Sequence, residues 1–163
     1  MTPSTATLAV FTAHDHARCR SGALDRAAER CRARRLRLTP ARAFALDALL
    51  ESHRALTAYE LLDRLRSAGH GGQPPVAYRA LGFLVENGLA HRIERLGAYV
   101  ACTAPEGAHP AAFMVCRACR AVAETALDSG PALADRARAA GFAAETTVVE
   151  IEGLCARCAT AAA

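Results

Sequence analysis

The chain of 163 residues contains no lysine and no tryptophan, and aromatic residues make up only 5% of it. Hydrophobic residues nevertheless account for 52%, so material for a core is present. Because large aromatic side chains are scarce, alanine and leucine must fill most of that core. A core of this kind would benefit from any additional cross-link that the chain provides.

Long apolar runs are also missing. No stretch approaches the roughly 20 apolar residues that a membrane-spanning helix needs. The first 19 residues lack the positively charged start of a signal peptide. We therefore expect a cytoplasmic protein without a membrane partner. In a reducing cytoplasm, paired cysteines hold metal more often than they form structural disulfides.

Charge is distributed unevenly along the chain, whose net charge is +4. Residues 1–105 contain 15 arginines and 9 acidic residues, whereas residues 106–163 contain 5 and 7. This asymmetry predicts a basic amino-terminal half that contacts a polyanion, and a carboxyl-terminal half with another task.

The order of the expected elements predicts an α+β protein. Residues 1–22 show no sustained periodicity and are expected to form a flexible arm. Residues 23–102 contain several amphipathic helices followed by a two-stranded hairpin, which describes a winged helix-turn-helix DNA-binding domain. Residues 103–112 are rich in proline, glycine and alanine and are expected to form a hinge. Residues 113–163 are expected to form a small α/β domain, with strands at 113–116, 121–126 and 145–152 and a helix at 132–140.

Local signals set several helix ends. The first helix is expected from Leu24 to Arg35. Thr39, followed by proline, and Thr57 are expected N-caps of the next two helices. Gly88 is expected at the carboxyl end of a helix over residues 75–87, because glycine readily adopts the left-handed conformation found there.

Two Cys-x-x-Cys pairs flank most of the second domain: Cys116 with Cys119, and Cys155 with Cys158. Four thiolates suit the tetrahedral coordination of Zn²⁺. The 35 residues between the pairs exceed the usual spacing of a zinc ribbon and fit a strand–helix–strand unit whose ends the metal clamps together. Core cysteines or a redox pair are the alternatives, but a redox motif needs one pair and usually opens a helix. Such a closed site is structural.

Four further residues are candidate metal ligands: His91, Cys102, His109 and Glu124. Taken singly, each has an ordinary explanation as a strand, hinge or solvated side chain. His91 and Cys102, however, lie on the two arms of the expected hairpin. His109 lies in the expected hinge, and Glu124 follows the first cysteine pair.

Several stretches of the chain resemble the ferric uptake regulator family. They are "RLRLTPARAFALDALL", "TAYELLDRLR", "PPVAYRALGFLVENGLAHRIERLGAYVAC" and "FMVCRACRAVAE…GFAAETTVVEIEGLCARC". The resemblance spans roughly residues 24–158 and is strongest to the zinc-sensing members. It implies a homodimer that pairs through the carboxyl-terminal domain and binds double-stranded operator DNA.

The same resemblance implies a second, regulatory zinc site, which in zinc-sensing members is formed by a histidine, a cysteine, a histidine and a glutamate. These ligands fall on His91, Cys102, His109 and Glu124, which gives two Zn²⁺ per chain. Iron- and peroxide-sensing relatives carry a histidine-rich cluster before the first cysteine pair, but here "AHPAAFMVC" contains one histidine. The soft thiol of Cys102 also favours zinc over Fe²⁺.

The expected DNA-reading helix has an apolar face and an opposite face that carries Arg79. An exposed arginine on the second helix of a helix-turn-helix can reach the guanine edge in the major groove. The resemblance assigns Arg79, Tyr78 and Tyr59 to the DNA surface. The family's Thr-Val before its Tyr-Arg pair is Val76-Ala77 here, so one hydroxyl group that could contact phosphate is absent.

The sequence thus predicts a zinc-responsive transcriptional repressor that controls zinc uptake genes and so serves metal homeostasis. An iron or peroxide sensor on the same scaffold is one alternative. A zinc or thiol-redox module without a DNA role is another, and the arginine excess over residues 1–105 argues against it. An enzyme is not expected, because no nucleophile–base set stands out and both metal sites look fully ligated.

Overall fold

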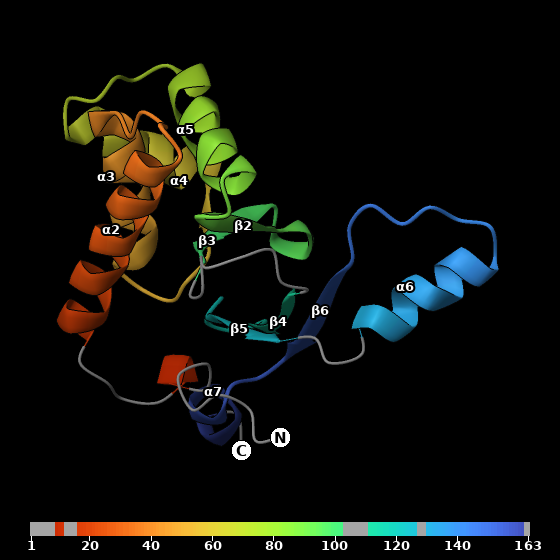
Figure 1. Ribbon diagram of the computed structural model, residues 1–163. Helices are drawn as coiled ribbons and strands as arrows, with labels where there is room; N and C mark the ends of the chain where they lie inside the picture. The colour runs from red at the N-terminus through yellow and green to blue at the C-terminus, as the bar shows by residue number, and fades with distance from the viewer. Residues whose placement is uncertain (1–8, 12–15, 103–110, 127–129, 162–163) are drawn as a thin grey trace. The chain divides into compact units, whose positions relative to one another are not determined.

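The computed structural model of the chain describes residues 9–11, 16–102, 111–126 and 130–161 (Figure 1). The chain divides into two compact units, Ala13–Glu106 and the combination of Met1–Thr12 with Gly107–Ala163. The division falls within the expected hinge at 103–112, of which residues 103–110 lie outside the described residues. No helix in the described part of the chain has both the length and the apolar character needed to cross a membrane.

The unit Ala13–Glu106 consists of helices followed by a hairpin. Its elements in chain order are α2 (His16–Ala33), α3 (Pro40–Leu50), β1 (Leu56–Thr57), α4 (Ala58–Ser67), α5 (Pro74–Glu86), β2 (Ala90–Ile93), the short 3₁₀ helix η2 (Glu94–Leu96) and β3 (Ala98–Ala101). The three strands form an antiparallel sheet in the order β1-β3-β2. Helices α3 and α4 both pack on α5. This is the winged helix-turn-helix arrangement, with α5 as its second helix and β2 and β3 as its wing.

Helix ends follow the expected capping residues. Thr57 forms a complete capping box, because Glu60 N–H donates to the Thr57 hydroxyl at 3.2 Å and Thr57 N–H donates to the Glu60 carboxylate at 2.7 Å. Thr39 has the extended backbone of an N-cap, and Pro40 occupies the first helical position, but the Thr39 side chain makes no capping hydrogen bond.

Helix α2 begins at His16, whereas the sequence pattern predicts a helix only from Leu24 and an arm through residue 22. A contact distant in sequence explains the additional turns. The Arg20 guanidinium donates two hydrogen bonds to the Asp47 carboxylate of α3, at 2.6 and 2.5 Å. Such a paired contact stabilises the start of α2 from outside the helix itself.

The core of this unit is built from leucine and alanine, as the composition predicts. Its fully buried leucines come from α4 and α5: Leu61, Leu65, Leu81 and Leu84. Phe83 is the one aromatic among the buried residues of this cluster. Close packing of small side chains, rather than a few aromatic rings, therefore holds the helices against the sheet.

The second unit contains a three-stranded mixed sheet. Its elements are η1 (Ala9–Phe11), β4 (Ala111–Cys116), β5 (Val122–Ala126), α6 (Gly130–Ala139), β6 (Val148–Gly153) and α7 (Ala156–Ala161). The strand order is β5-β4-β6, with β4 antiparallel to β5 and parallel to β6. The three strands and α6 match the expected elements to within a few residues, whereas α7 was not expected.

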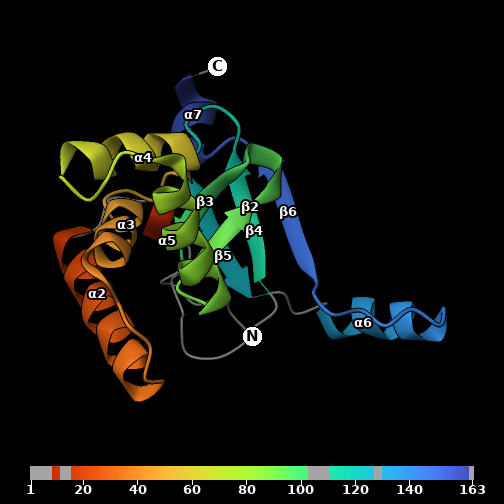
Figure 2. The ribbon, with the colours of Figure 1, turned by 90° about the horizontal axis from the view of Figure 1, so that it is seen from above.

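Apolar side chains of this unit are exposed on α6, on the following loop and on β6. Leu133, Phe142, Val148 and Ile151 are exposed to 42%, 67%, 51% and 53%. Figures 1 and 2 show α6 standing away from the three strands of its own unit. Since β6 is also an edge strand of the described sheet, exposed apolar surface adjoins a sheet edge here.

Candidate metal centres

The four cysteines of the two Cys-x-x-Cys pairs lie together within the second unit. Their sulfur atoms are all within 4.8 Å of one another. Cys116 ends β4 and Cys119 lies in the turn that follows, while Cys155 precedes α7 and Cys158 lies within it. The fold therefore brings into one cluster two pairs that are far apart in the sequence.

The mixed sheet explains how the two pairs meet. Because β6 runs parallel to β4, Cys116 lies opposite Gly153, two residues before Cys155. Arg117 N–H donates to the Gly153 carbonyl at 2.9 Å, which ties the first cysteine turn to the end of β6. Arg120 closes that turn in the left-handed conformation, with a φ of 61°, and its N–H donates to the Cys116 carbonyl at 2.9 Å.

The spacing of the sulfurs fits a tetrahedral ion with sulfur ligands. The Sγ atoms of Cys119 and Cys155 are 3.8 Å apart. Zn–S bonds of about 2.3 Å in a regular tetrahedron put neighbouring sulfurs about 3.8 Å apart. Four sulfur donors select Zn²⁺ or an iron–sulfur cluster rather than a hard cation such as Mg²⁺. A single ion at this spacing is the simpler fit and leaves no open coordination position.

The protonation of the thiols is set by their surroundings. Burial raises the pKa of Cys116, but hydrogen bonds from the backbone of Cys119, Cys155 and Ala118 outweigh it and lower that pKa to about 6. Hydrogen bonds to neighbouring sulfurs, first that of Cys155, raise the pKa of Cys158 to about 12. A metal held by four thiolates therefore displaces protons from this cluster when it binds. Metal affinity consequently falls as the pH is lowered.

Arg157 is a residue of this site that the sequence analysis did not single out. A hydrogen bond to Cys119 is the largest of the interactions that raise the pKa of Arg157, and the nearby sulfurs add to it. An arginine beside a four-thiolate site offsets part of its negative charge and orients a ligand. Its position between Cys155 and Cys158 in the sequence could have indicated that it lies beside the thiols.

The second set of candidate ligands is divided between the two units. In the unit Ala13–Glu106, His91 lies on β2 and Cys102 directly follows β3. A ring nitrogen of His91 and the Cys102 sulfur are within 4.8 Å of each other, and Cys102 is buried. In the other unit, Glu124 lies on β5 opposite Phe113, with a relative exposure of 6%. His109 lies outside the described residues.

The environment of these side chains suits a soft divalent cation. An imidazole and a thiol at short range provide the nitrogen and sulfur donors that zinc prefers. Glu124 is the one charged side chain that is buried in the described part of the chain. A buried carboxylate is normally paired with a cation or bound to a metal.

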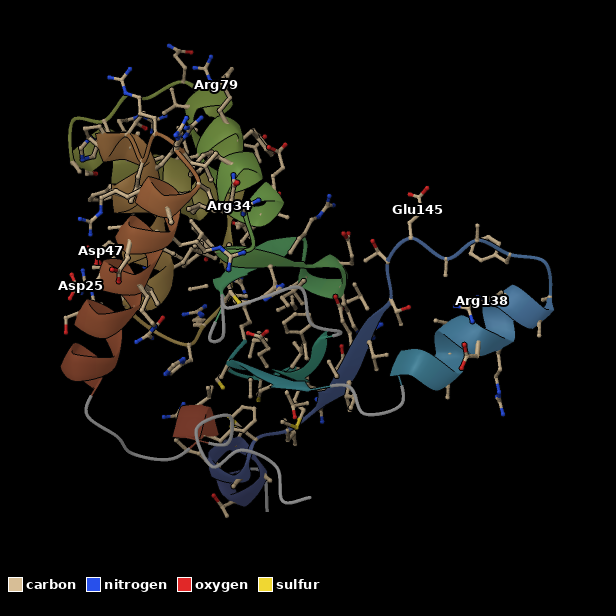
Figure 3. All side chains as sticks on the ribbon, in the orientation of Figure 1. Asp25, Arg34, Asp47, Arg79, Arg138 and Glu145 are labelled. Atoms are coloured by element: carbon tan, nitrogen blue, oxygen red, sulfur yellow. The ribbon has the colours of Figure 1, made fainter. Side chains whose placement is uncertain are left out.

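The helix-turn-helix presents the predicted DNA-reading residues on its surface. Tyr59 at the start of α4 and Tyr78 on α5 are exposed to 68% and 51%. Arg79 is exposed next to Tyr78, and Figure 3 labels it on α5, in the amino-terminal half of that helix. The opposite face of α5, which includes Ala77 and Leu84, is buried in the core. Two tyrosines and an arginine therefore lie on the solvent-exposed side of these helices.

Comparisons with curated proteins and with solved structures find similar proteins of one kind. No family model matches the chain. It is 38% identical over 130 residues to the zinc uptake regulation protein of Escherichia coli (strain K12), covering 78% of this chain and 76% of that protein. A solved zinc uptake regulator complexed with zinc and DNA is 36% identical, with a TM-score of 0.84, and the match covers 88% of this chain and 97% of that one. The crystal structure of holo XcZur is 37% identical, with a TM-score of 0.76 and coverage of 90% and 99%.

Proposed function

Because the chain belongs to the zinc uptake regulators of the ferric uptake regulator family, we propose that it is a zinc-responsive transcriptional repressor. It binds operator DNA as a homodimer, and it controls zinc uptake genes. The observation that carries this function is the identity of 38% to a zinc uptake regulation protein over most of both chains. The relatives are transcription regulators, and the chain is not an enzyme. Since a repressor works where the chromosome is, we also place it in the cytoplasm.

We propose two zinc ions per chain. The structural ion is held by Cys116, Cys119, Cys155 and Cys158, whose sulfurs lie within 4.8 Å of one another. The regulatory ion is held by the quartet His91, Cys102, His109 and Glu124. The proximity of His91 to Cys102 and the burial of Glu124 support this second assignment. The thiol of Cys102 favours zinc over iron at this position.

The division of the quartet between the units provides the regulatory mechanism. His91 and Cys102 belong to the DNA-binding unit, whereas Glu124 belongs to the unit that pairs the chains. A bound zinc ion supplies a cross-link between these groups. With the cross-link in place, the two DNA-reading helices of a dimer keep the separation that two half-sites require. Without it, DNA binding must also order the two units, which weakens affinity.

Dimer formation is assigned to the unit that contains Gly107–Ala163. The exposed apolar side chains of α6, the following loop and β6 adjoin the edge strand β6, which supports pairing of two copies there. A pair with two-fold symmetry matches a palindromic operator.

The proposed function is tested by operator binding with and without zinc. We expect fluorescently labelled operator DNA to bind the zinc-loaded dimer and to be released when a chelator removes the regulatory ion. Coupling of about 1–3 kcal/mol between zinc and DNA would be typical for an allosteric protein, and DNA must then tighten zinc binding by the same factor. Equal operator affinity in zinc and in chelator would contradict the proposal.

Replacing Arg79 by alanine should weaken operator binding by about 1–3 kcal/mol and relax base preference. The reason is that an arginine can donate two hydrogen bonds to one guanine, which alanine cannot replace. Affinities for operator and scrambled DNA, measured at one salt concentration, check this result. Arg138→Ala is the control, because Arg138 is an exposed arginine of α6 whose partner is Asp135 in the same helix. An equal loss of affinity for both DNA sequences would mean that Arg79 contacts only phosphate.

A further inference from the structure

The carboxyl end of α5 is closed by a specific turn. Gly88 has a φ of +66°, in the left-handed region. Gly88 N–H donates to the Val85 carbonyl at 3.0 Å, and Leu89 N–H donates to the Leu84 carbonyl at 2.8 Å. These two hydrogen bonds form a Schellman motif, which fixes the direction in which the chain leaves the helix. The direction taken here leads straight into β2.

The same turn is hydrogen-bonded to Cys102. The Leu89 carbonyl accepts a hydrogen bond from Cys102 N–H at 3.0 Å. This bond extends the ladder between β2 and β3 beyond its last pair, Ala90 with Ala101. The side chains of Leu89 and Cys102 also line one small apolar cavity, together with Ala27 and Leu46. Leu89 thus contacts the DNA-reading helix through its N–H and Cys102 through its carbonyl.

We propose that Gly88 and Leu89 are positioning residues that couple the regulatory site to the DNA-reading helix inside one unit. The Leu89–Cys102 bond is the last rung of this ladder, and a terminal rung opens before the inner ones when Cys102 is unrestrained. When Cys102 and His91 are held as metal ligands, the bond stays closed and the end of α5 is fixed with it. This inference rests on the proposed function, because it needs Cys102 and His91 to bind zinc. In addition to the proposed zinc cross-link, it gives the DNA-binding unit its own connection between the zinc ligands and the DNA-reading helix.

Gly88→Ala tests the route without touching a ligand. An alanine at a φ of +66° is strained, since its Cβ is too close to the following carbonyl group. The added methyl group would lie 3.3 Å from a guanidinium nitrogen of Arg30, a flexible end that can move aside. The strain therefore acts mainly on the turn, and it weakens the link from Leu84 to Leu89.

We expect Gly88→Ala to reduce the zinc-induced gain in operator affinity by about tenfold, which corresponds to about 1.4 kcal/mol. Zinc affinity in the absence of DNA, measured by competition with a chelating dye, should stay within about twofold of wild type. Gly88→Asn should restore the gain, because asparagine tolerates the left-handed conformation. If Gly88→Asn regains the zinc response, the loss in Gly88→Ala is due to strain in the turn and not to unfolding of the DNA-binding unit.

Gly69→Ala is the matched control. Gly69 closes the same kind of turn after α4 with a φ of +77°, and a methyl group there would contact nothing within 4 Å. It carries the same kind of backbone strain and should leave the zinc-induced gain unchanged. The inference is overturned if Gly88→Ala weakens operator binding equally with and without zinc, or if the gain is unchanged. A wild-type protein that shows no gain at all would instead contradict the proposed function.

Discussion

Replacing Cys155 by serine should release zinc from the four-thiol site and unfold the unit that pairs the chains. Cys155 is buried, its sulfur is 3.8 Å from that of Cys119, and its N–H donates to the Cys116 sulfur at 3.4 Å. Serine cannot supply the thiolate that this position needs, so the ion would lose a ligand that also anchors the backbone. We expect loss of the structural zinc and dissociation of the dimer.

The size of this effect follows from the small core of the unit. Its described residues bury few large side chains, chiefly Phe113, Val115 and Val122. A core in a domain of fewer than about 70–80 residues rarely supplies more than about 3–5 kcal/mol. Structural zinc sites in small peptides contribute about 10–16 kcal/mol. We therefore expect the proposed structural ion, rather than apolar packing, to determine whether this unit is folded.

Metal analysis and analytical ultracentrifugation of the purified variant measure both consequences. Cys31→Ala is the control, because Cys31 is another buried cysteine but lies in α2 of the other unit. That variant should keep its zinc and remain a dimer, with at most a modest loss of stability. A Cys155→Ser protein that remains a dimer with its full zinc content would show that the four thiols do not hold a structural ion.

Cys102→Ser should abolish the zinc response while leaving a folded dimer. The Cys102 backbone N–H, which donates to Leu89, is kept in the variant, and serine is close to cysteine in size. The DNA-binding unit should therefore fold normally. What is lost is the soft sulfur donor beside His91, and a hydroxyl group is a poor zinc ligand by comparison.

The expected result is an operator affinity that no longer changes with zinc, a loss of about 5–150-fold in the zinc-induced gain. Titration of labelled operator at fixed free zinc concentrations measures it. Glu124→Gln should have the same effect from the other unit, whereas Glu29→Gln on α2 should not, since Glu29 is exposed and is no member of the proposed quartet. A normal zinc response in Cys102→Ser would remove Cys102 from the regulatory site.

Features set by neighbouring residues were predictable from the sequence. Thr57 and Glu60 form the capping box that their spacing allows, and Gly88 adopts the left-handed turn expected at the end of α5. The order of helices and hairpin was also predictable, because hydrophobic periodicity and capping residues act within a few residues of one another. These signals suffice to identify a winged helix-turn-helix.

Features that depend on distant partners were not predictable. The early start of α2 depends on the pairing of Arg20 with Asp47, which no local pattern reveals. The parallel pairing of β4 with β6 likewise joins segments that a helix separates in the sequence. The short helix α7 has only six residues, too few to form without the contacts of the cysteine cluster.

The candidate sites also differ in whether local sequence signals were enough to predict them. The two cysteine pairs were recognisable by spacing alone, and the structure places all four sulfurs in one cluster. His91 and Cys102 became candidates because the expected hairpin put them on adjacent strands, and they are neighbours in the structure. The assignment of His109 and Glu124 to the same ion depended on the family resemblance, since no local rule connects a hinge histidine with a strand glutamate. Their roles stay proposals.

The central claim is that occupancy of the second zinc site switches on DNA binding. The most direct measurement records operator affinity and zinc bound per chain on the same samples, as zinc is added to protein that holds one ion. We predict that protein with one zinc per chain is a dimer with weak operator affinity, and that affinity rises in step with the second ion. Full operator affinity at one zinc per chain would contradict the account.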